Sequence, residues 1–306
     1  IIRYQGFDKF AGYVSGNVDF HAHIDQEGNL DWWKDTIIDN EKGYTTDLIT
    51  RYGVEFIKAN NPEVSGTPFF LYLPHEAPHY PFQKRVDKIL REVGKKETTK
   101  VPADSIPMIY KEMVEVMDEG IGQIIQTLKE TGLDKSTIVI FCSDNGAARY
   151  GNNGILNGFK GSVYEGGHRV PAIAWYPEKF NAGTVNDQPV LSMDFLPTML
   201  DFIGAKPTGN NIDGISIKNL LVAEEELPER DLFWSYGNKK AIRSGDWKLV
   251  SNIVKGKETI ELFNLSDDIS EKNDLAAQES ELVQQLRQKL ENWQKEVRAG
   301  VDIISK

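Results

Sequence analysis

Two long segments of the chain repeat apolar residues every three or four positions, which is the spacing of a helix with one buried face. The first segment spans residues 44–60, and Pro62 follows it as a stop signal. The second spans residues 107–131 and is followed by Gly132, which suits the left-handed conformation at a helix end. The pattern therefore predicts two amphipathic helices that pack on a hydrophobic core.

Three shorter apolar runs have the length and composition of buried strands. They are residues 68–73 (PFFLYL), 137–142 (TIVIFC) and 172–176 (AIAWY). The helix at 107–131 leads through a short turn into the second run, which is the order of an αβ unit in a layered sheet. We therefore expect an α/β fold with a doubly wound, mostly parallel sheet flanked by helices.

The pattern changes beyond an acidic stretch at residues 224–227. Short strand-like runs separated by turns then predict an antiparallel meander, at residues 232–236, 239–244, 247–250 and 260–264. A last amphipathic helix is predicted over residues 279–297, packed across that small sheet. We therefore expect a larger domain over residues 1–222 and a C-terminal α+β subdomain, an antiparallel sheet plus helix, over residues 223–306.

Composition narrows the possible functions. The chain has 35 Lys and Arg against 46 Asp and Glu, a formal net charge of −11, which argues against a general nucleic-acid or polyanion-binding surface. No apolar run approaches the roughly 18 residues of a membrane span. The single cysteine, Cys142, lies inside a predicted strand and allows no intrachain disulfide. An anionic substrate would therefore need local positive charge from a metal and a few basic side chains.

Polar residues follow the predicted strand at 137–142. Asp144 and Asn145 come directly after it, and the glycine-rich loop beyond them carries Lys160. Ligands of open α/β sheets bind beyond the carboxyl ends of the strands. The two side-chain oxygens of Asp144 and Asn145 could bind Ca²⁺ or Mg²⁺, and Lys160 could add positive charge to an anion held by that metal. The alternative interpretation is an ordinary turn followed by a solvated lysine.

Histidines mark two other places in the chain. His75 and His79 lie in the motif HEAPHYP directly after the run at 68–73, where a histidine by itself is more often a hydrogen-bonded loop residue. His21 and His23 would point the same way if their segment were extended. An H-x-H pair without a third ligand is a weak metal motif. Two interpretations stay open for this pair, a contact with the substrate and a structural role in a hydrogen-bonded loop.

Several of these stretches resemble the sulfatases, a family of the alkaline phosphatase superfamily. They are SDNG followed by GFKGSVYEGGHRVPAIAWYP, the motif HEAPHYP, and GFDKFAGYVSGNVDFHAH at residues 6–23. The helix and strand that lead to SDNG, and the C-terminal stretches, are also similar to that family. The resemblance implies an alkaline phosphatase-like fold, a catalytic domain over residues 1–222, and metal-assisted hydrolysis of a sugar or aryl sulfate ester.

The resemblance also implies roles for the residues singled out above. Asp144 and Asn145 would bind the metal, Ca²⁺ in the first place and Mg²⁺ as the alternative. Lys160 and His79 would be catalytic, because both could neutralise charge that develops in the transition state and His79 could supply a proton to the leaving oxygen. Three further histidines would contact the substrate: His21, His23 and His75.

The chain departs from the family pattern at the nucleophile. A sulfatase uses a formylglycine made from the Cys or Ser of a C/S-x-P/A-x-R motif, and no such motif occurs in the sequence. The early acidic pair and the Lys/His motif of the family are absent as well. We therefore expect an N-terminally truncated catalytic domain, the C-terminal two-thirds of a sulfatase, which is inactive by itself and could associate with its own N-terminal segment.

Two alternatives for the function stay open. One is a phosphodiesterase or phosphonate hydrolase of the same superfamily, because the nucleophile that would discriminate them is absent. The other is a non-catalytic module that binds sulfated glycans. The expected partner is a small-molecule or glycan sulfate ester and not nucleic acid, and the family suggests a periplasmic or secreted protein.

Overall fold

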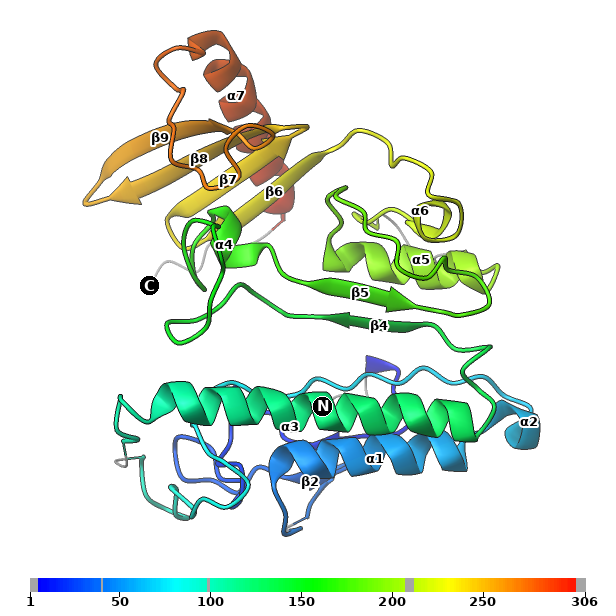
Figure 1. The fold of residues 1–306 in the computed structure, drawn as a ribbon. Coiled ribbons are helices and arrows are strands. Elements are labelled where there is room, and N and C mark those ends of the chain that lie inside the picture. The colour runs from blue at the N-terminus through cyan, green and yellow to red at the C-terminus, as the bar shows by residue number, and fades with distance from the viewer. Residues whose placement is uncertain (1–4, 40, 98–99, 207–211, 301–306) are drawn as a thin grey trace. The chain divides into compact units, whose positions relative to one another are not determined.

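The computed structural model describes residues 5–39, 41–97, 100–206 and 212–300. The chain divides into two compact units, Ile1–Thr137 and Ile138–Lys306 (Figure 1). The predicted domain boundary after residue 222 falls inside the second unit and stays a prediction.

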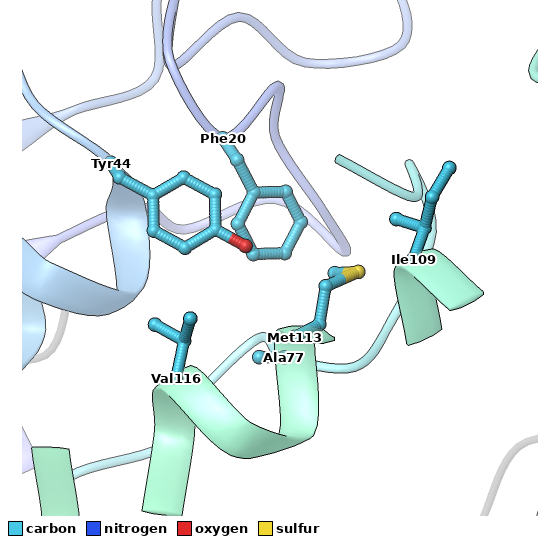
Figure 2. Packing of buried hydrophobic residues seen from close by; sticks show 6 residues of the cluster. All are labelled: Phe20, Tyr44, Ala77, Ile109, Met113 and Val116. Carbon is cyan, nitrogen blue, oxygen red and sulfur yellow. The ribbon is translucent and has the colours of Figure 1, made fainter. Parts of the chain in front are cut away.

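Two helices, α1 (Thr45–Ala59) and α3 (Ile106–Glu130), lie side by side in the first unit, which confirms the two helices predicted from the apolar spacing. They approach closely where Gly120 faces Thr50, since a Cβ on Gly120 would lie 2.2 Å from Thr50 Oγ1. Figure 2 shows Ile109, Met113 and Val116 of α3 turned towards Phe20 and Tyr44. The apolar stripe of α3 thus forms the core that its period predicts.

The rest of the first unit is mostly loop, with the short helix α2 (Pro62–Ser65) and the small antiparallel sheet of β1 (Ala11–Gly12), β2 (Trp33–Lys34) and β3 (Ile37–Ile38). Buried polar side chains hold these loops. The fully buried carboxylate of Asp19 accepts hydrogen bonds from the backbone N–H groups of four residues: His21, Ala22, Leu90 and Arg91. The loops are thus fixed by side chains where no strand ladder satisfies the backbone.

The predicted strand at residues 68–73 is wrong for the structure described, since these residues form no strand, and Phe70 and Tyr72 are 65% and 66% exposed. The other two apolar runs do form strands, β4 (Val139–Cys142) and β5 (Ala172–Trp175), which pair antiparallel. All the paired strands of the described residues are antiparallel. The expected mostly parallel sheet is therefore not confirmed. A run of apolar residues indicates that a strand is buried. Whether the strand pairs in parallel or antiparallel depends on which other strand lies next to it, and the run does not show that.

The second unit contains the predicted meander, with strands in the order β6 (Asp231–Tyr236), β7 (Lys239–Ser244), β8 (Trp247–Val254) and β9 (Lys257–Asn264), all antiparallel. Helix α7 (Ser280–Val297) runs across this sheet in Figure 1. Its buried Leu286 and Leu290 pack on the sheet residues Ile242, Leu249 and Leu262. The predicted antiparallel meander and the helix packed on it are confirmed.

Short helices complete the second unit: α4 (Glu165–His168), the 3₁₀ helix Ser192–Asp194, α5 (Phe195–Phe202) and α6 (Lys218–Ala223). Asp194 is fully buried and pairs with Arg230, its Oδ1 lying 2.7 Å from Arg230 Nη1. The same carboxylate accepts the backbone N–H groups of Leu191 and Ile215. Asp194 thus joins three segments and has a structural role.

Candidate functional site: the loop between strands β4 and β5

The candidate metal ligands lie where β4 ends. Asp144 is exposed and Asn145 is half-buried. The side-chain amide nitrogen of Asn145 donates to the carbonyl of Gly146 at 3.2 Å, so its Oδ1 is the atom that could bind a cation. One carboxylate and one amide oxygen are hard ligands that fit Ca²⁺ or Mg²⁺. Among the residues that the structure describes, no cluster of three or more His, Cys, Asp or Glu side chains could hold a metal.

Lys160 belongs to the same loop as these ligands. Its backbone N–H donates to the carbonyl of Ala147 at 3.0 Å, and its side chain is exposed. Asn153 supports this arrangement, because its Oδ1 accepts the N–H of Ala147 at 2.8 Å. Its Nδ2 donates to the carbonyls of Gly158 and Gly166. Asp144, Asn145 and Lys160 thus lie in one loop, whereas their roles as metal ligands and catalytic lysine stay predictions. The supporting Asn153 was not predicted, because an Asn-Asn-Gly run indicates only a turn.

Three glycines let the two ends of the loop touch. The N–H of Gly146 donates to the carbonyl of Gly167 at 3.0 Å. A Cβ on Gly146 would lie 1.9 Å from the carbonyl oxygen of Gly166, and one on Gly167 would lie 2.1 Å from that of Ser162. Only glycine permits such backbone contacts. The segment that follows Asn145 is therefore packed directly on α4.

Cys142 lies beside this site at the end of β4. It is half-buried, and burial, together with the nearby Asp144 carboxylate, raises the pKa of its thiol. A thiol with a raised pKa is protonated at neutral pH and is a poor nucleophile. The environment of Cys142 therefore supports a packing role.

The candidate histidines all lie in the first unit. His79 is exposed, and its Nδ1 is 2.9 Å from the carbonyl oxygen of Tyr80. His75 is more enclosed: its Nδ1 is buried without a hydrogen-bond partner, and burial lowers its pKa to about 4. A histidine with that pKa is neutral near pH 7. The catalytic role of His79 and the substrate contact of His75 stay predictions.

The segment of His21 and His23 is a turn, so the extended arrangement in which both side chains would point the same way is not formed. His23 has a left-handed φ of 53°, and its ring stacks on Trp32 with centroids 4.2 Å apart. The ring of His21 instead lies 5.2 Å from that of Tyr44, and its Nε2 is 2.9 Å from the carbonyl oxygen of Lys84. His23 is 1% exposed, and burial lowers its pKa. The substrate-binding role assigned to the pair stays a prediction.

The helices of the described residues include none that combines the length and apolar character needed to cross a membrane.

Comparison with known proteins places the chain among sulfatases. Residues 3–205 match the Sulfatase family, and residues 157–296 match the family described as N-sulphoglucosamine sulphohydrolase, C-terminal. A sulfatase of Formosa agariphila is 30% identical over 301 residues, which cover 88% of this chain and 52% of that protein. The N-acetylgalactosamine-6-sulfatase of Mus musculus is 32% identical over 211 residues, covering 66% of this chain and 38% of the enzyme.

A solved structure agrees with these matches. The crystal structure of Ps i-CgsB in complex with k-i-k-neocarrahexaose aligns with a TM-score of 0.80 and 28% identity, covering 95% of this chain and 67% of that one. The chain spans about half the length, or less, of the curated relatives named above. By both family matches and by relatives along most of its length, the chain belongs to the sulfatase family of the alkaline phosphatase superfamily.

Proposed function

We propose that the chain carries the metal- and sulfate-binding loop of a sulfuric ester hydrolase that acts on a sugar sulfate. The observation that carries the proposal is the geometry of the loop between β4 and β5. There the backbone bonds Gly146–Gly167 and Lys160–Ala147 hold a carboxylate, an amide oxygen and an ammonium group in one short segment. Family membership supports the reaction class.

In this proposal each side chain has a defined task. The Asp144 carboxylate and the Asn145 Oδ1 would hold Ca²⁺, with Mg²⁺ as the alternative, and the bound cation would act as a Lewis acid that orients sulfate oxygens. Lys160 would neutralise negative charge on the sulfate as the ester bond breaks. His79 would give a proton to the leaving oxygen, a step for which histidine is suited near neutral pH.

The proposal also concerns where the nucleophile of the reaction comes from. A formylglycine is expected in this family, and its C/S-x-P/A-x-R source motif does not occur in these 306 residues. Cys142 does not fit that motif, because Ser143, Asp144 and Asn145 follow it in the sequence. We therefore propose that the chain by itself does not turn over an ester and that it acts as part of a longer, exported protein.

The choice of a sugar sulfate rests on the relatives. The Mus musculus relative is named for a sulfated amino sugar, and Ps i-CgsB was crystallised with a neocarrahexaose. An aryl or steroid sulfate is the second candidate, because a 156-residue stretch is 35% identical to the steryl-sulfatase of Mus musculus.

The test is a release assay on the complete gene product that contains this chain. Matched pairs of substrates, a sugar sulfate and the same sugar phosphate, and an aryl sulfate and the same aryl phosphate, are compared with and without added Ca²⁺. We expect release of sulfate from the sugar, dependence on the cation, and at least about tenfold less phosphate release. Cleavage of a phosphate diester or a phosphonate ester, assayed in parallel, without sulfate release would favour the phosphodiesterase or phosphonate hydrolase. Binding of the sulfated sugar without hydrolysis would favour the glycan-binding module.

A further inference from the structure

We infer that Lys248 is a positioning residue that fixes the candidate metal-binding loop to the C-terminal sheet through one buried ion cluster. This inference rests on the proposed function of the loop. The Lys248 cluster consists of four residues: Lys248, Glu165, Glu271 and His168.

The cluster is centred on an ammonium group with no access to water. Lys248 lies on β8 and is 0% exposed. Its Nζ is 2.8 Å from Glu165 Oε1 on α4 and 2.9 Å from Glu271 Oε1, which follows β9 in the chain. The Nε2 of His168 lies 3.1 Å from the same nitrogen. A charge this far from water is stable only with such partners, so each partner's position is tightly constrained.

The electrostatics agree with this arrangement at Glu165 and His168, whereas at Glu271 burial outweighs the charge of Lys248 and raises the pKa of the carboxyl group. Burial acts to raise the pKa of Glu165, but the Lys248 charge and hydrogen bond outweigh it, so the pKa is lowered and the carboxylate is ionised. Burial, and then the charge of Lys248, lower the pKa of His168 to about 4. A neutral His168 can accept a hydrogen bond from the ammonium through its Nε2. Its ring also stacks on Trp234, with centroids 4.2 Å apart, which covers one side of the cluster.

Glu271 connects the cluster to the backbone of α4. Its Oε2 accepts the N–H of Glu165 at 2.7 Å, so it satisfies a donor at the first residue of this helix. The side chain and the backbone of Glu165 are thus both held by groups from the C-terminal sheet and the loop that follows it. Residue 165 cannot shift without breaking one of these bonds.

A short path of direct contacts leads from Glu165 to the metal ligands. Gly166 and Gly167 follow Glu165 in α4, and the carbonyl of Gly167 accepts the N–H of Gly146, the neighbour of Asn145. The contact between Gly146 and Gly166 leaves no space for even one methyl group. Asn153, which donates to the carbonyl of Gly166, also holds the N–H of Ala147, whose carbonyl binds the N–H of Lys160.

A purely apolar cluster could bury the same surface. Apolar packing is non-directional, whereas an ion cluster has fixed distances and angles. The apolar contact beside it, formed by Val163 with Ala241, Val250 and Phe263, provides burial for this interface. The ion cluster additionally fixes the position of α4 along the sheet. The glycine contacts then couple the position of α4 to that of Asn145.

The experiment compares hydrogen exchange and Ca²⁺ binding in the complete gene product. The main variant is Lys248→Met, and the second is the neutral triple variant Lys248→Met, Glu165→Gln, Glu271→Gln, which leaves no buried charge unpaired and therefore folds if the single variant does not. The control is Arg230→Met with Asp194→Asn, an ion pair of the same unit in which Asp194 is buried and Arg230 is partly exposed, with no hydrogen bond to the loop among those described.

We expect amide exchange in the peptide that contains Gly146 and Lys160 to accelerate at least tenfold in the main variant and severalfold in the triple variant. Ca²⁺ affinity measured by calorimetry should fall by at least tenfold in the main variant. The control pair should change neither quantity in this loop. Unchanged exchange in a folded triple variant, or equal acceleration in the control, would overturn the inference. If the parent protein binds neither Ca²⁺ nor Mg²⁺ while exchange responds as expected, the proposed metal site fails and the positioning role stands.

Discussion

The two units fix their loops with different kinds of buried polar group. In the first unit, the Asp19 cluster (Asp19, Gln83 and Arg91) bonds mainly to backbone atoms, since Asp19 accepts four backbone N–H groups and Arg91 donates to the carbonyls of Asn17 and Ile24. In the second unit, the Lys248 cluster joins charged side chains to one another. The Asp19 cluster replaces absent secondary structure, whereas the Lys248 cluster connects two elements that are already formed.

This difference predicts where each cluster is sensitive. Losing a group that serves the backbone exposes several donors or acceptors at once, and each orphaned group costs about 1–3 kcal/mol. Losing one member of a buried ion cluster leaves the remaining buried charge without a partner of opposite sign. This loss lowers the unfolding free energy by about 3–5 kcal/mol. Neutralising all charged members of the ion cluster together should lower the unfolding free energy much less. The same approach is not possible for Asp19, because its partners are backbone N–H groups that substitution does not remove.

The largest effect is expected for Lys248→Met. It leaves Glu165 and Glu271 buried without their shared cation, and we expect the second unit to lose about 4 kcal/mol of unfolding free energy. Hydrogen exchange of peptides from β7 and β8 measures this loss unit by unit, which is necessary because two units need not unfold in one step. The neutral triple variant should recover more than half of the loss. A triple variant as unstable as the single one would contradict the distinction between the clusters.

A somewhat smaller effect is expected for Asp19→Ala in the first unit. The change removes the acceptor of four backbone N–H groups and of Gln83 Nε2. The expected loss is about 3 kcal/mol, because water that enters the space left by the side chain can accept hydrogen bonds from most of these donors. Exchange of the amides of residues 21, 22, 90 and 91 reports it. Asp19→Asn, which keeps one acceptor oxygen, is the matched control and should lose less. Equal losses would show that the charge, and not the acceptor count, matters here.

The pH dependence of the second unit should follow His168. Its pKa is lowered from 6.5 to about 4 by burial and by Lys248, so between these pH values the unfolded state binds more protons and stability falls as the pH falls. A pKa lowered from 6.5 to about 4 corresponds to at most about 3.4 kcal/mol of stability. His168→Gln keeps an acceptor for Lys248 and should flatten this slope in denaturation experiments at pH 6.5 and pH 4.5. An unchanged slope would mean that His168 titrates normally.

The smallest effect is expected at the surface. Arg287 and Glu291 form an i, i+4 pair on α7, with N and O atoms 3.1 Å apart and both side chains 47% exposed. Glu291→Gln should change the stability of the second unit by about 0.5 kcal/mol or less, and added salt should remove the difference. A larger effect would show that exposed charges contribute as much as the buried clusters do.

The parts of the fold that were predicted correctly are those whose partners lie close in the sequence. The meander β6–β9 pairs neighbouring strands, so each strand of the predicted set finds its partner across a short turn. The helices α1 and α3 have periodic stripes that need only a common core. The predicted strand at residues 68–73 differs, because an apolar run becomes a strand only when another strand pairs with it.

The candidate site was predicted in part for the same reason. Asp144, Asn145 and Lys160 are separated by at most 16 positions, and a resemblance to sulfatases marks them directly. The supporting residues Glu165 and Lys248 are separated by 83 positions. Nothing in the sequence around Lys248, a lysine in an alternating strand, indicates that its ammonium is buried. The turn at His23 was missed because alternation of residue types does not reveal a left-handed φ.

The most direct test of the account is the sulfate release rate of the complete gene product with Lys160→Ala. Lys179→Ala, which removes another exposed lysine of the second unit, is the matched control. We predict that kcat for a sugar sulfate falls about 100-fold or more with Lys160→Ala, because a charge that acts on the transition state is lost, and that it is unchanged with Lys179→Ala. Equal rates for the two variants would contradict the assignment of this loop as the sulfate-binding site.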